Sequence, residues 1–180
     1  MTIAKRLKQG IPFVILFLLL SMLWHELYSA GVNKHNASII GDPLPNFSLP
    51  VLGSPNKTFS PANLKGKVTL INVFASWCSA CNAEHDMMMK IRSEYGIPIY
   101  GILYRDRAND AIQWLARKGN PYVMVGNDSR GVTGVDFGIY GTPETFLVSP
   151  QGRIIYRHPG VIDQSTWDND IYPLIKQYRE

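Results

Sequence analysis

The chain has 180 residues, of which 46% are hydrophobic and 18% are charged; this is enough for one domain with a buried core and a short appendage, and it excludes a long disordered protein. The formal net charge is +4, but Lys5, Arg6 and Lys8 supply three of the positive charges, so the remainder is close to balanced and predicts no nucleic-acid-binding surface. The only two cysteines, Cys78 and Cys81, are too few for the disulfide framework of a small secreted scaffold.

The N-terminal segment has the pattern of a membrane anchor. Residues 9–25 carry no fixed charge, and residues 11–23 are almost entirely apolar. A helix over residues 9–25 would be roughly 25 Å long, just short of the ~30 Å hydrocarbon core of a bilayer. We therefore predict a cytoplasmic N-terminus over residues 1–8 and a single transmembrane helix over residues 9–28.

The same pattern also fits a cleavable signal peptide. Cleavage after Ala30 would place the bulky Tyr28 where such peptides carry a small residue, so the sequence favours a retained anchor. Because the Lys/Arg cluster precedes the apolar stretch, the positive-inside rule carries everything after Tyr28 out of the cytoplasm. We expect the rest of the chain to work in an oxidising compartment.

After the anchor, the sequence changes from a linker to a folded domain. Residues 31–46 are polar, include two prolines and show no sustained period, so we place a linker at 29–42 and the domain at 43–180. Residues 47–52 and 57–60 predict a short β-hairpin at the start of the domain. Residues 68–74 are β-branched and aromatic, which predicts a buried central strand running into the first cysteine.

The rest of the domain alternates between helical and strand patterns. Because strands separated by helices favour parallel pairing, we expect an α/β fold with crossover helices. The sequence ends with a second predicted hairpin and a closing helix. The predicted elements are helices at 80–95, 108–118 and 164–178, and strands at 97–104, 122–125, 145–148 and 153–156.

The two cysteines form a Cys-x-x-Cys motif where a buried strand turns into a helix. Cys78 is expected at the helix N-terminus, where unpaired N–H groups and the helix dipole stabilise a thiolate. Cys81 lies three residues on, on the same face and one turn deeper. Cys78 can therefore attack a disulfide of another protein, and Cys81 can resolve the mixed disulfide.

Other uses of the pair are weighed from its neighbours. Haem attachment requires His directly after the second cysteine, and this position is Asn82. A structural zinc site needs two more ligands at regular spacing, which the four histidines do not supply. A copper site of Cys78, Cys81 and either His85 or His158 stays open, as does a purely structural disulfide, although so small a loop adds little stability.

Two segments carry a resemblance to a known family. Residues 77–81, Trp-Cys-Ser-Ala-Cys, resemble the active site of thioredoxin-fold proteins, and residues 141–146, Gly-Thr-Pro-Glu-Thr-Phe, resemble the loop that carries their cis-proline. With residues 72–77, Glu84-His85 and residues 134–140, the domain is similar to the membrane-anchored thiol:disulfide interchange proteins of cytochrome c maturation, the DsbE/CcmG family. The resemblance extends over about residues 40–180.

The resemblance implies a fold and a function. The fold would be a thioredoxin fold, a central mixed β-sheet flanked by helices, here with an N-terminal β-hairpin extension and a single N-terminal transmembrane helix in the bacterial inner membrane. The domain would lie in the periplasm and reduce apocytochrome c, directly or through a thiol protein of cytochrome c assembly. It would be re-reduced by a membrane electron donor of the DsbD type. Its redox centre would be the Cys78–Cys81 disulfide, with no other cofactor and no metal.

The resemblance also assigns roles beside the cysteines. Glu84 and Glu144 match acidic positions near the active site and are candidates for redox tuning and proton transfer; the alternative for each is a solvated surface carboxylate. Thioredoxins carry a buried Asp six residues before the first cysteine, whereas this chain has Asn72, for which we expect a hydrogen-bonded amide inside the central strand.

The substrate-binding candidates are Trp77, Thr142 and Pro143. We expect Trp77 to act mainly in packing and also to form one side of the active site. A cis Pro143 would hold the backbone of Thr142 beside Cys78, where it can pair with an extended substrate segment. The alternative for Pro143 is an ordinary trans turn proline.

Other functions stay open. A general periplasmic disulfide reductase or oxidase would use the same cysteines, because the Ser79-Ala80 dipeptide does not by itself set the potential. A copper-binding thioredoxin-like chaperone would use the thiols as ligands. Residues 59–67 resemble the approach to a peroxiredoxin active site, but such peroxidases carry Thr where this chain has Ala75.

Overall fold

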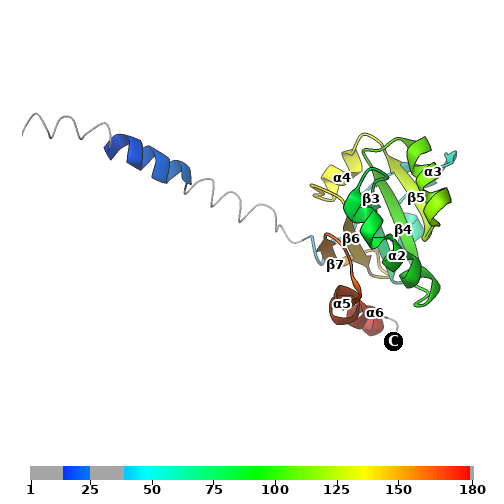
Figure 1. Ribbon diagram of the computed structural model, residues 1–180. Helices are drawn as coiled ribbons and strands as arrows, with labels where there is room; N and C mark the ends of the chain where they lie inside the picture. The colour runs from blue at the N-terminus through cyan, green and yellow to red at the C-terminus, as the bar shows by residue number, and fades with distance from the viewer. Residues whose placement is uncertain (1–13, 25–38, 179–180) are drawn as a thin grey trace, which may run out of the picture. The chain divides into compact units, whose positions relative to one another are not determined.

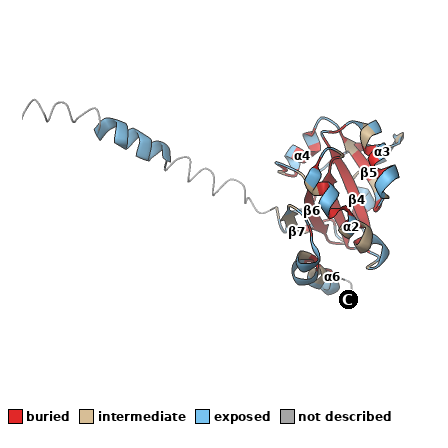
Figure 2. Ribbon diagram, viewed as in Figure 1, coloured by how far each residue is buried: buried red, intermediate tan, exposed pale blue. Residues whose placement is uncertain are grey.

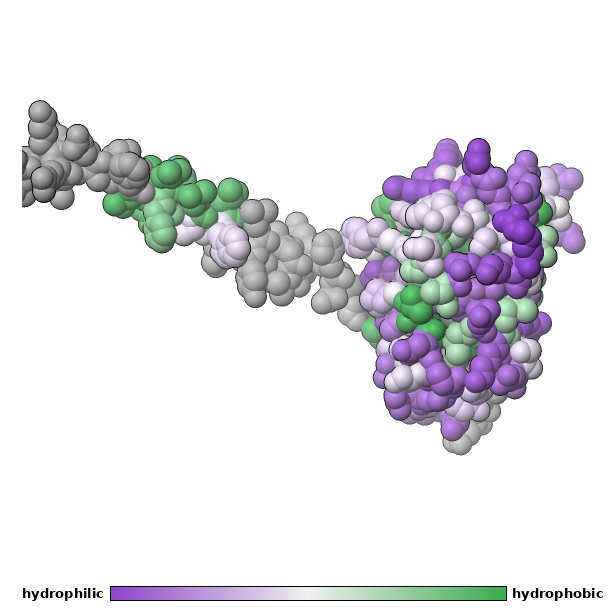
Figure 3. Space-filling view, viewed as in Figure 1, coloured by the Kyte–Doolittle hydropathy of each residue, from purple (hydrophilic) through white to green (hydrophobic). Residues whose placement is uncertain are grey.

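The computed structural model describes residues 14–24 and 39–178 (Figure 1). Residues 14–24 are helical and exposed, and Figure 3 shows them as a hydrophobic segment. Neither this helix nor any helix within 39–178 combines the length and the hydropathy that a membrane crossing requires. The predicted segment 1–8, both ends of the predicted span 9–28 and most of the predicted linker lie outside the described residues, so these assignments stay predictions.

Residues 39–178 form an α/β domain around a seven-stranded mixed sheet with the strand order β2-β1-β5-β4-β3-β6-β7. Strands β3, β4 and β5 are parallel, while β6 runs antiparallel to β3 and β7 antiparallel to β6. The predicted hairpins and parallel order are confirmed. The strands are β1 (Leu49–Val51), β2 (Ser54–Phe59), β3 (Thr69–Phe74), β4 (Ile99–Tyr104), β5 (Tyr122–Asp128), β6 (Glu144–Val148) and β7 (Ile154–Pro159).

The helices occupy the predicted places with three differences. The 3-10 helix at Pro61–Leu64 was not predicted. The short helix α4 was not predicted, because its five residues are too few to show a helical period. The single predicted C-terminal helix contains a π-helical segment in its middle. The helical elements are η1 (Pro61–Leu64), α2 (Ser79–Ser93), α3 (Ala108–Lys118), α4 (Val132–Asp136), α5 (Gln164–Thr166), η2 (Trp167–Ile171) and α6 (Tyr172–Gln177).

Figure 2 shows the strands in the middle of the sheet as buried. All six residues of β3 are buried, and alternate residues belong to two different cores. Leu70 and Phe74 pack into the core under α2, α3 and the C-terminal helices. Ile71 and Val73 pack into the opposite core, together with β1, β2 and residues near α4. Since successive side chains of a strand point to opposite faces, Asn72 lies between Leu70 and Phe74 on the face that α2 covers.

The start of the domain is fixed to the turn between β6 and β7. The Gly41 N–H donates to the Ile154 carbonyl oxygen at 2.7 Å, and the Leu44 N–H donates to the Gly152 carbonyl oxygen at 3.0 Å. The Ile154 N–H donates in return to the Asp42 carbonyl oxygen at 3.0 Å. Residues 41–44 therefore extend the hydrogen bonding of the sheet before β1 begins.

Gly134 in α4 is a position where a side chain does not fit. A Cβ atom at this residue would collide with Cε2 and Cδ2 of Tyr104, a buried residue at the end of β4. We expect Gly134→Ala to lower the free energy of unfolding by about 1–3 kcal/mol through overpacking. Urea denaturation of the oxidised protein measures this, with Gly141→Ala as the control, because a Cβ at Gly141 meets no atom within 4 Å. Equal stability of the two variants would contradict the prediction.

Candidate active site

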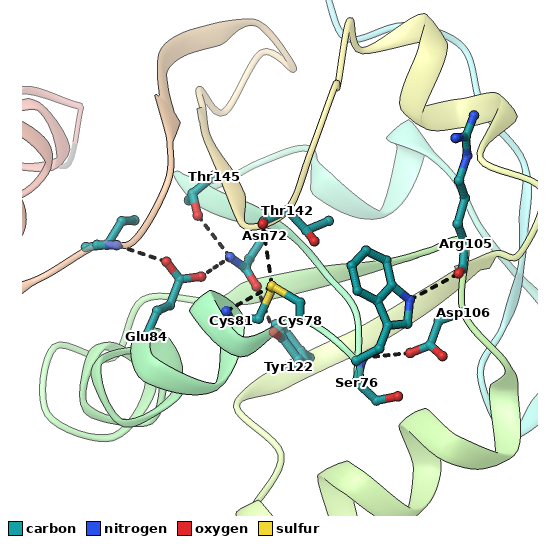
Figure 4. The surroundings of a disulfide bond; sticks show 12 residues. Asn72, Ser76, Cys78, Cys81, Glu84, Arg105, Asp106, Tyr122, Thr142 and Thr145 are labelled. Atoms are coloured by element: carbon teal, nitrogen blue, oxygen red, sulfur yellow. Dashed lines mark hydrogen bonds between the residues drawn. A yellow bond between two sulfur atoms is a disulfide. The ribbon is translucent and has the colours of Figure 1, made fainter.

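The two cysteines form a disulfide at the start of α2 (Figure 4). Cys78 is the N-cap of the helix, and its Sγ accepts a hydrogen bond from the Cys81 N–H at 3.0 Å. Both residues are buried, and their Cα atoms are 5.2 Å apart. The helix N-terminus thus presents a backbone donor to the Cys78 sulfur, which favours a thiolate there in the reduced protein.

The loop before β6 meets the disulfide from the other side. The Thr142 carbonyl oxygen lies 3.4 Å from Cys78 Sγ, and the Thr142–Pro143 peptide bond is cis. Thr142 and Pro143 therefore lie beside the cysteines, as the motif predicted, although Thr142 follows Cys78 by 64 residues in the sequence.

Trp77 borders the site as an exposed side chain, with 62% of its surface accessible, so the expectation that packing is its main role is wrong. Its indole Nε1–H donates to the Arg105 carbonyl oxygen at 3.2 Å. Beside it, the Ser76 N–H donates to Oδ2 of Asp106, a buried residue, at 2.6 Å. The loop after β4 thus holds the turn before Cys78, a role of Arg105 and Asp106 that no pattern in the sequence indicated.

Glu84 lies one turn after Cys81 on α2 and is buried, so the alternative of a solvated surface carboxylate is wrong. Its Oε1 accepts from the Asn72 amide Nδ2 at 2.7 Å, and its Oε2 accepts from the Ile162 N–H at 2.9 Å. Burial raises the pKa of Glu84 from 4.5 to about 7, although these two hydrogen bonds lower it. Glu84 can therefore gain and lose a proton near neutral pH.

Glu144 is also buried, but it lies on the other face of the sheet. It alternates with Thr145 and shares its face with Phe146, which packs in the core opposite α2. The Arg157 guanidinium forms an ion pair with the Glu144 carboxylate and lies over the Phe146 ring. Burial raises the pKa of Glu144, and Arg157 lowers it. The structure thus separates the two predicted acids, and it shows a partner, Arg157, that sequence reasoning missed.

The histidines considered as copper ligands contact backbone carbonyls. His85 Nε2 lies 3.1 Å from the Gly119 carbonyl oxygen, and His158 Nε2 lies 3.2 Å from the Val161 carbonyl oxygen. Burial lowers the pKa of His85. Within residues 14–24 and 39–178, no three His, Cys, Asp or Glu side chains are grouped so that they could hold a metal ion.

The parts together suit thiol–disulfide exchange. Cys78 is the candidate nucleophile and receives a backbone donor, while Cys81 lies one turn deeper and can resolve a mixed disulfide. Glu84 follows on the same helical face and can accept a proton. The exposed Trp77 and the Thr142 carbonyl oxygen border the nucleophile and are available to a bound polypeptide.

Comparisons with known proteins agree with this chemistry. The Redoxin family matches residues 39–172. The thiol:disulfide interchange protein DsbE of Yersinia pestis is 41% identical over 172 residues, covering 92% of this chain and 91% of the relative. DsbE of Escherichia coli (strain K12) is 38% identical over 179 residues, covering 97% of this chain and 96% of the relative.

Solved structures share the fold. The secreted thiol-disulfide isomerase of Corynebacterium glutamicum superposes with a TM-score of 0.65 at 20% identity, covering 74% of this chain and 85% of that chain. The thio-disulfide isomerase of Thermus thermophilus superposes with a TM-score of 0.61 at 23% identity, covering 74% and 95% of the two chains. With its thioredoxin-like fold, its Cys78–Cys81 pair and its near full-length similarity to these interchange proteins, the chain is a thiol:disulfide oxidoreductase and belongs to the DsbE family.

Proposed function

We propose that this protein is a membrane-anchored periplasmic reductant of cytochrome c maturation. Its substrate is the disulfide of an apocytochrome c haem-attachment motif, or of a thiol protein that assembles the cytochrome. The proposal is supported by the shared motifs around Cys78 and Pro143, by family similarity over nearly the whole chain, and by the basic, then apolar N-terminal sequence. The observation that carries it is the Cys78–Cys81 pair at the start of α2 with the buried Glu84 one turn behind.

The exchange cycle uses two electrons from the reduced cysteines. The Cys78 thiolate attacks one sulfur of the substrate disulfide, forming a mixed disulfide and releasing the first substrate thiolate. Cys81 then passes its proton to the Glu84 carboxylate and attacks Cys78 Sγ. This step forms the Cys78–Cys81 disulfide and releases the second substrate thiolate. The substrate is thereby reduced and this protein oxidised, and a membrane dithiol donor of the DsbD type returns both electrons.

Two features around the cysteines act on the redox potential in opposite directions, and the buried acid acts in the reducing one. A helix N-terminus stabilises the Cys78 thiolate and with it the reduced form, as in strong oxidants. The carboxylate of Glu84, one turn from Cys81, opposes negative charge on the thiols when it is ionised. A less stable thiolate means a less stable dithiol, which gives up its electrons more readily.

The reduction potential of the Cys78/Cys81 pair tests this assignment. We expect a value closer to that of thioredoxin, about −270 mV, than to that of DsbA, about −120 mV. The measurement is equilibration of the protein with glutathione redox buffers, followed by trapping and quantification of free thiols. The reduced protein should also convert an oxidised Cys-x-x-Cys-His peptide to its dithiol form. A potential near that of DsbA, or a peptide that stays oxidised, would rule out the reductase.

A further inference from the structure

A chain of buried hydrogen bonds connects three strands to the acid behind the cysteines (Figure 4). The Tyr122 hydroxyl on β5 donates to Asn72 Oδ1 on β3 at 2.7 Å. The Asn72 amide nitrogen donates to Glu84 Oε1 at 2.7 Å and to Thr145 Oγ1 on β6 at 3.0 Å. The Ile162 N–H completes the chain by donating to Glu84 Oε2 at 2.9 Å. All four side chains are buried.

This arrangement gives each end of the Asn72 amide a defined partner. An amide has one acceptor oxygen and two N–H donors, and the orientation is inferred from the groups around it. With Nδ2 toward Glu84, both carboxylate oxygens receive donors, which suits an ionised acid. If the amide turned over, Oδ1 would face Glu84 Oε1, and the contact would be favourable only with a proton on the acid.

The Tyr122 hydroxyl decides between these two orientations. It donates to Oδ1 in the observed arrangement. In the turned arrangement it would face the amide N–H groups, and its own hydrogen would lose this acceptor in a buried place. Such an unpaired donor costs about 1–3 kcal/mol. Phe at position 122 would remove this preference, because neither end of the amide would then find a partner there.

The Asn72 amide is the side-chain hydrogen-bond partner of Glu84, so its orientation strongly affects the charge state of this acid. Two donors contact the Glu84 carboxylate: the Asn72 amide from β3 and the Ile162 N–H from the loop after β7. Thr145 of β6 contacts Asn72, and Cys81 precedes Glu84 by one turn of α2. Asp163, next to Ile162, caps the Thr166 N–H and is exposed, while the His85 ring packs on Trp114. In the described part of the chain, no Lys, Arg or His forms an ion pair with Glu84.

We propose that Tyr122 is a positioning residue for the resolving step: its hydroxyl fixes the Asn72 amide so that Glu84 meets Cys81 as a proton-accepting carboxylate. The inference rests on the proposed function in one respect, that Glu84 receives the Cys81 proton. In the exchange cycle that proton moves from Sγ of Cys81 to the carboxylate, and the electron pair left on sulfur forms the bond to Cys78 Sγ. Tyr122 itself transfers no proton and contacts no substrate.

The direct test is the titration of Glu84 in the oxidised full-length protein, followed by ¹³C NMR of its carboxyl carbon. In the unmodified protein we expect a midpoint at about 7. Tyr122→Phe should shift the midpoint upward by roughly one pH unit. The control is Tyr100→Phe, because Tyr100 is also buried but stacks on Phe59 in the opposite core; its midpoint should not move. A midpoint unchanged or lowered by Tyr122→Phe would overturn the proposal.

A second variant covers the case in which Tyr122→Phe does not fold. Incorporation of 3-fluorotyrosine at position 122 keeps the ring and the hydroxyl but makes the hydroxyl a stronger donor. It should strengthen the observed amide orientation and shift the Glu84 midpoint downward. No shift, or an upward shift, would contradict the proposal.

The kinetic counterpart is the pH profile of the resolving step, measured as release of a thiol from a preformed mixed disulfide on Cys78. Tyr122→Phe should move the rise of this rate to higher pH, by the same shift as the Glu84 midpoint. A purely structural role would lower stability and leave the profile in place. The Glu84 titration requires no reductase activity, so an oxidising potential would reject the proposed function and leave the Tyr122 result to be judged by itself.

Discussion

Replacing Cys81 with Ala is expected to produce a protein that attacks a substrate disulfide once and stays covalently bound to it. The backbone N–H that donates to Cys78 Sγ belongs to residue 81 itself, so the substitution retains the donor that favours the thiolate. What is lost is the second sulfur, which resolves the mixed disulfide. Multiple-turnover reduction of an oxidised Cys-x-x-Cys-His peptide should therefore fall to at most one equivalent per protein.

Intact mass measurement checks this result. The reduced Cys81→Ala protein should gain the mass of one peptide, and dithiothreitol should remove it. The control is Cys78→Ala, in which the remaining thiol lies one helical turn deeper and should form no adduct. Peptide captured by the Cys78→Ala protein, or none captured by Cys81→Ala, would show that the roles of the two sulfurs are assigned wrongly.

Replacing Glu84 with Gln is expected to remove a pH dependence from the stability of the oxidised protein. Burial raises the pKa of Glu84 from 4.5 to about 7, so the folded state binds this proton more tightly than the unfolded state. The free energy of unfolding should therefore fall as the pH rises from about 4.5 to about 7, and it should level off above that range. The corresponding loss is about 3 kcal/mol.

Urea denaturation of the full-length protein at pH values from 4 to 8 measures the effect. Relative to the unmodified protein, Glu84→Gln should gain about 3 kcal/mol between the two ends of this range. The matched control is Glu94→Gln, because Glu94 follows the same helix but has 64% of its side chain exposed; its pH dependence should parallel the unmodified protein. Parallel curves for Glu84→Gln as well would mean that the carboxyl does not retain its proton on folding.

Local patterns in the sequence predicted most of the fold. The apolar run at 68–74 and the Cys-x-x-Cys motif after it fix a buried strand that enters a helix, and the structure has β3 and α2 there. The cis peptide bond at Pro143 was expected from the resemblance to thioredoxin-fold proteins. The helix α4 and the π segment were missed, because short or irregular turns leave little periodic signal.

The partners of the site residues were not predictable in the same way. Tyr122 donates to a residue 50 positions earlier, and Arg157 pairs with an acid on a neighbouring strand. Such contacts depend on strand order and register, which one sequence does not state. A signal did exist for Asn72: it shares a face with Leu70 and Phe74, so its buried amide had to find partners on that side.

The attachment of residues 41–44 to the β6–β7 turn fixes the point at which the chain enters the domain. β6 starts beside Thr142 and the cysteines and runs away from them, antiparallel to β3, so this turn lies at the opposite end of the strand. Five residues of strand extend about 17 Å. The chain therefore enters the domain at the end of β6 that lies farthest from Cys78 and Cys81.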